Sequence, residues 1–68
     1  MVWVRMRKIG YKLYEPIDEV EERPKNAEIR EICVVVDING RLYVARTQAY
    51  VYGDFAFIER ERFEKEML

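Results

Sequence analysis

The sequence predicts a mainly β domain of the α+β class, with an antiparallel sheet of three or four strands and a short C-terminal helix. Three features predict it: apolar residues that alternate from Val2 onward, an unbroken β-branched run from Ile32 to Val36, and an Asn39-Gly40 dipeptide between this run and the next apolar segment. With 68 residues, the chain is too short for two hydrophobic cores. Residues 1–68 are therefore expected to form a single domain.

The first strand is predicted to be long and bent. Its apolar side chains occupy even positions at first and odd positions later, at Val2, Val4, Met6, Ile9, Tyr11 and Leu13. Keeping all of them on one face requires one extra residue between Arg7 and Gly10, which a β-bulge or a glycine-assisted bend would supply. A bend at Gly10 would curve the sheet towards an SH3-like half-barrel.

An acidic segment follows, bracketed by Pro16 and Pro24. Proline lacks the N–H that a central strand donates, so residues 15–27 are expected to form a loop or an excursion at a sheet edge, with a turn of helix over residues 17–22 as an alternative. Charge is unevenly placed here, because residues 1–14 contain four basic and no acidic side chains while residues 15–22 contain five acidic and no basic ones. A basic strand is thus followed by an acidic connection.

The middle of the chain predicts a β-hairpin. The run from Ile32 to Val36 is typical of a central strand that is covered on both faces. Asn39-Gly40 forms either a two-residue type I′ loop or, with Asp37 as its first residue, a type I turn in which Gly40 takes the left-handed position. The returning strand is expected to run from Leu42 to Tyr52.

Two interpretations compete for residues 54–58. In the first, Gly53-Asp54 is a type II′ turn and a fourth strand follows, with Tyr52 opposite Phe55 and Tyr50 opposite Phe57. In the second, Asp54 caps a helix that continues to the C-terminus, but the apolar residues would then scatter around that helix. We favour the hairpin. In both interpretations residues 59–68 are helical in character.

The composition argues against catalysis. The chain has no histidine, no serine, one cysteine and one threonine, so it lacks the nucleophile and base pairs of acyl transfer and the four ligands of a structural zinc site. The acidic residues 15–22 match no calcium loop, and the isolated glycines form no phosphate loop. We predict that the protein is not an enzyme and binds no metal or cofactor.

Cysteine use and hydropathy indicate the compartment. Cys33 lies in an apolar run and has no second cysteine with which to form an intramolecular disulfide, which fits a reducing cytoplasm. No segment approaches the length of a membrane span, and the first ten residues contain cations instead of a signal-peptide core. We predict a cytoplasmic protein without a membrane partner, and the scarcity of asparagine and glutamine predicts a thermophilic source.

The outward face of the first strand is one candidate binding surface. Cations alternate there with aromatic residues, as they do on surfaces that bind single-stranded nucleic acids: Trp3, Arg5, Arg7, Lys8, Lys12 and Tyr14. These cations could instead pair with the acids of residues 15–22. The isoelectric point of about 5.5 also lies well below that of a typical nucleic-acid-binding domain.

The second candidate surface is aromatic. Five rings fall within a short stretch of the chain, at Tyr43, Tyr50, Tyr52, Phe55 and Phe57, and tyrosine is enriched at protein interfaces. Because the run from Ile32 to Val36 is apolar on both faces, we expect the C-terminal tail to cover one face of the sheet and a second copy to cover the other. We therefore predict a homodimeric, non-catalytic interaction module that acts through protein contacts, with a nucleic-acid-binding module as the alternative.

Overall fold

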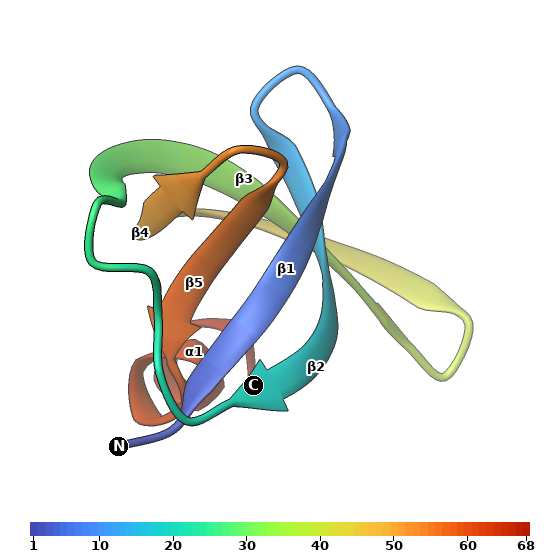
Figure 1. Cartoon of the computed structure of the whole chain (residues 1–68). Helices are drawn as coiled ribbons and strands as arrows, with labels where there is room; N and C mark the ends of the chain where they lie inside the picture. Colours follow the sequence, from blue (N-terminus) through green and yellow to red (C-terminus); the bar gives the residue numbers. More distant parts are fainter.

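The computed structural model describes all 68 residues, as five strands and one C-terminal helix (Figure 1). The elements are β1 (Trp3–Gly10), β2 (Leu13–Val20), β3 (Glu28–Ile38), β4 (Arg41–Tyr52), β5 (Phe55–Glu59) and α1 (Arg60–Met67). The strands form a closed barrel in sequence order, with β5 pairing back onto β1. A mainly β chain with a short terminal helix is confirmed. The predicted count of three or four strands is too low, and the barrel is closed where a half-barrel was expected.

The predicted long first strand is in fact two strands joined by a tight turn. The extra residue expected before Gly10 is Ile9, which has no partner in the pairing with β2. The strand does not continue beyond Gly10, because Tyr11 and Lys12 reverse the chain and Lys12 adopts a left-handed φ of 54°. Ile9 and Tyr11 are consequently exposed, and the prediction that they share the inner face was wrong.

The first part of the acidic segment is strand β2, where a loop was expected. β2 pairs with β1 along its length, whereas only Leu13 and Tyr14 pair with β3, in parallel orientation. Beyond Tyr14, β2 is therefore an edge strand, which is where a sheet tolerates a proline such as Pro16. The irregular register beside Pro16 leaves Ile17 unpaired. The parallel contact makes the sheet mixed instead of purely antiparallel, and only residues 21–27 connect β2 to β3 without strand structure.

β3 and β4 form the predicted hairpin, and its turn is type I′. Asn39 and Gly40 both have positive φ angles, 54° and 81°, and Ile38 pairs directly with Arg41. The Asp37 carboxylate accepts a hydrogen bond of 2.9 Å from the Gly40 N–H, which fixes the turn. The pairing continues without a register shift to Glu28 and Val51, so β3–β4 is the longest ladder in the molecule.

The hairpin interpretation of residues 54–58 is confirmed, and the helical one was wrong. Gly53 takes the positive φ of 59° that a type II′ turn needs at its first position. Tyr52 then lies opposite Phe55, and Tyr50 lies opposite Phe57, as the sequence predicts.

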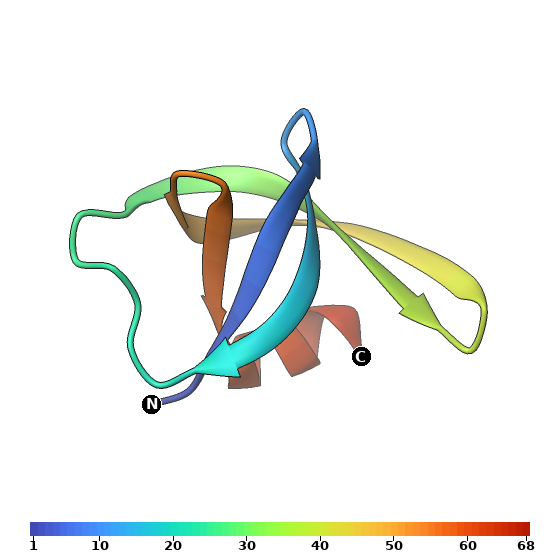
Figure 2. The same ribbon diagram turned by 45° about the vertical axis from the view of Figure 1, so that its right-hand side comes forward.

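The hydrophobic core fills the barrel. Helix α1 covers one end of the barrel (Figure 2). Met6 and Val34 are fully buried at its centre, and Met67 of α1 joins the same cluster with Phe63 packed against it. Ile32 and Val34 of the β-branched run point inwards, while Cys33, Val35 and Val36 are half-buried. No helix in the structure is long and apolar enough to cross a membrane.

Candidate interaction surface

The arginines of β1 are matched by acids of β2. The hairpin register puts Arg5 opposite Asp18 and Arg7 opposite Glu15. Arg5 donates two hydrogen bonds to Asp18, the one from Nε spanning 2.8 Å, and Arg7 donates one of 2.5 Å to Glu15. The hydrogen bond from Arg5 lowers the pKa of Asp18 below its ordinary value, so this pair is ionised at neutral pH. Both arginines are therefore engaged within the chain.

Tyr14 lies inside the barrel and does not belong to the exposed face predicted for it. It is only 4% exposed and belongs to the core cluster, because the turn after β1 reverses the chain and points its ring inwards. Burial raises the pKa of the Tyr14 hydroxyl, while the positive charge of Arg30 partly opposes this rise and Asp54 adds to it. Tyr14 is thus a structural residue of the barrel.

Lys8 and Lys12 remain as cations of the predicted nucleic-acid face that take part in no ion pair. Together with Arg30 they line a pocket of about 440 Å³ beside the β1–β2 turn. Tyr11 forms part of its wall, and the Lys12 Nζ lies 5.5 Å from the centroid of that ring. Arg30 itself pairs with Glu28, which offsets part of the positive charge.

The two predicted surfaces meet on one side of the barrel. Trp3 of β1 contacts Tyr50 of β4 edge to face, with ring centroids 5.7 Å apart. Between them in the sheet order runs β5, where Phe57 pairs with both Arg5 and Tyr50. The Arg5 guanidinium also lies 5.4 Å from the Phe55 ring centroid. We call this surface the outer aromatic face, formed by Trp3, Arg5, Tyr50, Tyr52, Phe55 and Phe57.

The chain itself covers part of the outer aromatic face. The Arg23 guanidinium lies 3.7 Å from the ring centroid of Tyr50 and 5.3 Å from that of Trp3. It also donates a hydrogen bond of 3.1 Å to the Pro24 carbonyl, while its buried Nε has no partner. Phe57 is only 5% exposed, although it was predicted as an interface residue. Tyr52 and Phe55 are the rings of this face that remain exposed.

A second apolar surface lies on the β3–β4 hairpin, which projects beyond the barrel in both views (Figures 1 and 2). We call residues 35–44 the arm. Leu42 is 70% exposed, Val44 is 64% exposed, and Tyr43 is 47% exposed. Of the predicted interface residues, only Tyr43 belongs to the arm, and it lies on the opposite face of β4 from Tyr50.

Sequence reasoning did not select Leu42 and Val44 as binding residues. A signal for them exists, because Leu42, Tyr43 and Val44 are consecutive and a strand turns successive side chains to opposite faces. An unbroken apolar run on the returning strand therefore places apolar groups on both faces of the hairpin. The run from Ile32 to Val36 is likewise apolar on both faces, which is why the sequence predicts that a second copy covers one of them. The same two-sided apolar pattern continues onto β4.

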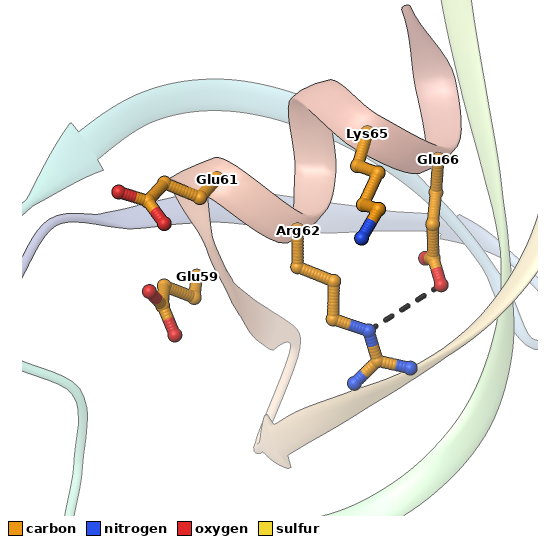
Figure 3. Close-up of a pocket in the computed structure, with 5 residues that line it drawn as sticks. All are labelled: Glu59, Glu61, Arg62, Lys65 and Glu66. Carbon is orange, nitrogen blue, oxygen red and sulfur yellow. Dashed lines mark hydrogen bonds and ion pairs between the residues drawn. The ribbon is translucent and has the colours of Figure 1, made fainter.

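A hollow of about 600 Å³ lies beside α1 and is lined by charged side chains alone (Figure 3): Glu59, Glu61, Arg62, Lys65 and Glu66. Arg62 and Glu66 pair at 3.4 Å one turn apart, and Glu66 also accepts a hydrogen bond from the buried Thr47 hydroxyl. Ligand pockets usually have apolar walls with a few polar groups. This hollow is therefore a poor candidate for a small-molecule site.

No group of three or more acidic, histidine or cysteine side chains is placed to hold a metal ion. The acids of β2 point instead to the arginines of β1, and Glu19 pairs with Arg60 at 3.4 Å. Comparison of the chain with protein-family models, curated proteins and solved structures gives no match.

Proposed function

We propose that the protein is a non-catalytic interaction module that forms a homodimer through its arm. The observation that carries this proposal is the exposure of Leu42, Tyr43 and Val44 on a projecting hairpin. Leu42 and Val44 lie on one face of β4 and Tyr43 on the other, and together the three residues leave on the order of 300 Å² in solvent, an amount of exposed surface that on small proteins is often functional. A chain of 68 residues has little core to spare, so apolar residues kept outside it point to a partner.

A second copy is the occupant that fits this surface best. Complete burial of this surface in both copies would contribute at most about 15 kcal/mol at 25 cal/mol per Å². Association costs roughly 4–15 kcal/mol in lost freedom, so a dimer of moderate affinity is the expected outcome. The net charge of −1 sets up little repulsion between copies, and residues 42–45 carry no charged side chain.

The substitution Leu42→Thr tests the proposal. Threonine is β-branched and favours strands, and Leu42 makes little contact in the monomer, so the fold should persist. A symmetric dimer contains two copies of Leu42, and each truncation would remove about 1.5 kcal/mol of the free energy gained by burial. The dissociation constant should therefore rise roughly 100-fold in sedimentation equilibrium.

Leu68→Thr is the matched control, because Leu68 is similarly exposed, at 75%, but lies at the C-terminus away from the arm. It should leave the dimer unchanged. Equal weakening by both substitutions, or no effect of Leu42→Thr on a dimer that does form, would rule out the arm as the interface.

A second candidate function, binding of single-stranded nucleic acid, is favoured by the two unpaired lysines. Lys8 and Lys12 line one pocket with Arg30 and Tyr11, which combines cations for phosphate with a ring for base stacking. This candidate predicts salt-dependent binding of a mixed-sequence oligonucleotide that Lys8→Ala and Lys12→Ala both weaken. Lys25→Ala, an exposed lysine elsewhere, is the control. An absence of binding at low salt would exclude this function.

A further inference from the structure

The geometry of the arm points to a specific mode of dimerisation. We propose that two arms pair through the outer edges of their β4 strands, antiparallel and about a two-fold axis at Tyr43, so that one sheet continues across the dimer. This inference rests on the proposed function, because it specifies how the arm binds its second copy. Four features of the structure support it.

The first feature is an unpaired strand edge. β4 pairs with β3 from Arg41 to Val51, but it pairs with β5 only from Tyr50 to Tyr52. From Arg41 to Ala49 its second edge has no neighbouring strand. A row of free N–H and C=O groups on an apolar strand is a template on which another strand can pair.

The second feature is the direction of the free backbone groups. The Cys33 N–H donates a hydrogen bond of 2.7 Å to the Lys12 carbonyl, so it points away from β4. In an antiparallel ladder, pairs that exchange hydrogen bonds alternate with pairs whose backbone groups point outwards. Cys33 pairs with Arg46, and by this alternation the pair of Val35 and Val44 also points its backbone groups outwards.

The same alternation applies to the pair of Asp37 and Leu42 next to the turn. It agrees with a two-residue type I′ turn, in which the closing pair of Ile38 and Arg41 faces inwards. Leu42 and Val44 therefore present their N–H and C=O groups on the free edge of β4, and the N–H of Tyr43 is used within the hairpin.

The third feature distinguishes the two edges of the arm. The free edge of β3 is short, since Cys33 and Val34 already lie beside β2 and the turn begins after Ile38. It also carries Asp37, and a charged residue on an edge strand opposes further pairing. The free edge of β4 is longer, and its charged residues, Arg41 and Arg46, flank an uncharged stretch from Leu42 to Ala45. The β4 edge is therefore the one open to a second copy.

The fourth feature is self-complementarity. With the two-fold axis at Tyr43, each Leu42 lies opposite the Val44 of the other copy, and both residues have outward backbone groups that can exchange hydrogen bonds. The two Tyr43 rings meet on the opposite face. Every side chain in these central pairs is apolar, as cross-strand pairing favours, and the arrangement is isologous.

Val44→Pro tests this pairing. Proline removes the outward N–H of Val44, which by the alternation makes no bond to β3, and edge strands tolerate proline. The symmetric dimer would lose two hydrogen bonds, so its dissociation constant should rise at least tenfold. Gln48→Pro is the matched control: by the same alternation its N–H also points outwards on the β4 edge, but Gln48 lies outside residues 41–45, which face each other across the two-fold axis. It should leave the dimer unchanged, and circular dichroism should show both variants folded.

Amide hydrogen exchange of the unmodified chain provides a measurement that needs no variant. The Leu42 and Val44 amides should become protected as protein concentration rises, while the Asp37 amide, which points outwards on the β3 edge, should not. Weakening by Gln48→Pro would overturn the placement of the two-fold axis, and protection of the Asp37 amide that rises with concentration would overturn the choice of edge. A dimer that Leu42→Thr weakens but Val44→Pro does not would overturn edge pairing and leave the proposed function standing. A chain that stays monomeric would overturn both.

Discussion

Replacing Tyr14 by alanine should cost far more stability than replacing Tyr11, three residues earlier on the same hairpin. Tyr14 is 4% exposed and Tyr11 is 86% exposed. A buried tyrosine removes on the order of 200 Å² from water. At 25 cal/mol per Å² this is about 5 kcal/mol, at the upper end of the usual 3–5 kcal/mol for removing a buried aromatic ring. Tyr11→Ala should change the free energy of unfolding by about 0.5 kcal/mol or less.

Urea unfolding followed by the fluorescence of the single tryptophan measures this difference, at one fixed protein concentration because a dimer couples stability to concentration. A domain of this size has a total stability of roughly 3–10 kcal/mol, so Tyr14→Ala should lie at the margin of folding. Tyr14→Phe, which keeps the ring, should remain folded. Similar losses for Tyr11→Ala and Tyr14→Ala would refute the placement of Tyr14 in the core, and with it the β1–β2 hairpin.

The other predictions concern pH and two glycines. Because the pKa of Tyr14 is raised in the folded state, the unfolded chain ionises first, and the stability advantage of the wild type over Tyr14→Phe should shrink as pH rises through the ordinary value of 10.0. The pKa of Asp18 is lowered by Arg5, so the wild type should lose stability relative to Asp18→Asn as pH falls through 3.8, and high salt should reduce the effect. Gly40→Ala should cost about 1 kcal/mol in thermal unfolding, because φ is 81° there and the left-handed region strains a side chain. Gly10→Ala should cost little, since its added Cβ meets Leu13 atoms no closer than 3.7 Å and its φ is not left-handed.

Local signals in the sequence were sufficient for the two tight hairpins. Asn39-Gly40 and Gly53-Asp54 define turns through the conformations that asparagine and glycine adopt, and a two-residue turn then fixes the cross-strand register. The aromatic pairs of β4 and β5 followed from that register. Phe63 and Met67 are four residues apart on one helix face, and both pack on the core.

The first hairpin could not be predicted in the same way. Its turn uses Tyr11 and Lys12, of which Lys12 has a left-handed φ that no residue preference indicates. Pro16 argued against a strand, but β2 is an edge at that point and needs no N–H from it. The closure of the barrel by β5 and β1 depends on contacts between distant segments, which alternation of apolar residues cannot specify.

For the candidate sites too, the sequence indicated local features but not how distant segments come together. The sequence identified the outer aromatic face as two separate surfaces, because it does not show that β1, β5 and β4 are neighbours. The sequence also indicated, as an alternative, that Arg5 and Arg7 pair with the acidic residues that follow. The register of β1 and β2 produces these ion pairs. The arm was implied by apolar residues on both faces of the central hairpin, but its projection beyond the barrel is a property of the whole fold.

The mass of the wild-type chain in solution, measured by sedimentation equilibrium from low to high micromolar concentration, tests the central proposal most directly. We expect the mass to rise from 8.3 kDa towards twice that value, and Leu42→Thr to shift the rise to higher concentration while Leu68→Thr does not. A mass of 8.3 kDa at every concentration would contradict homodimerisation through the arm.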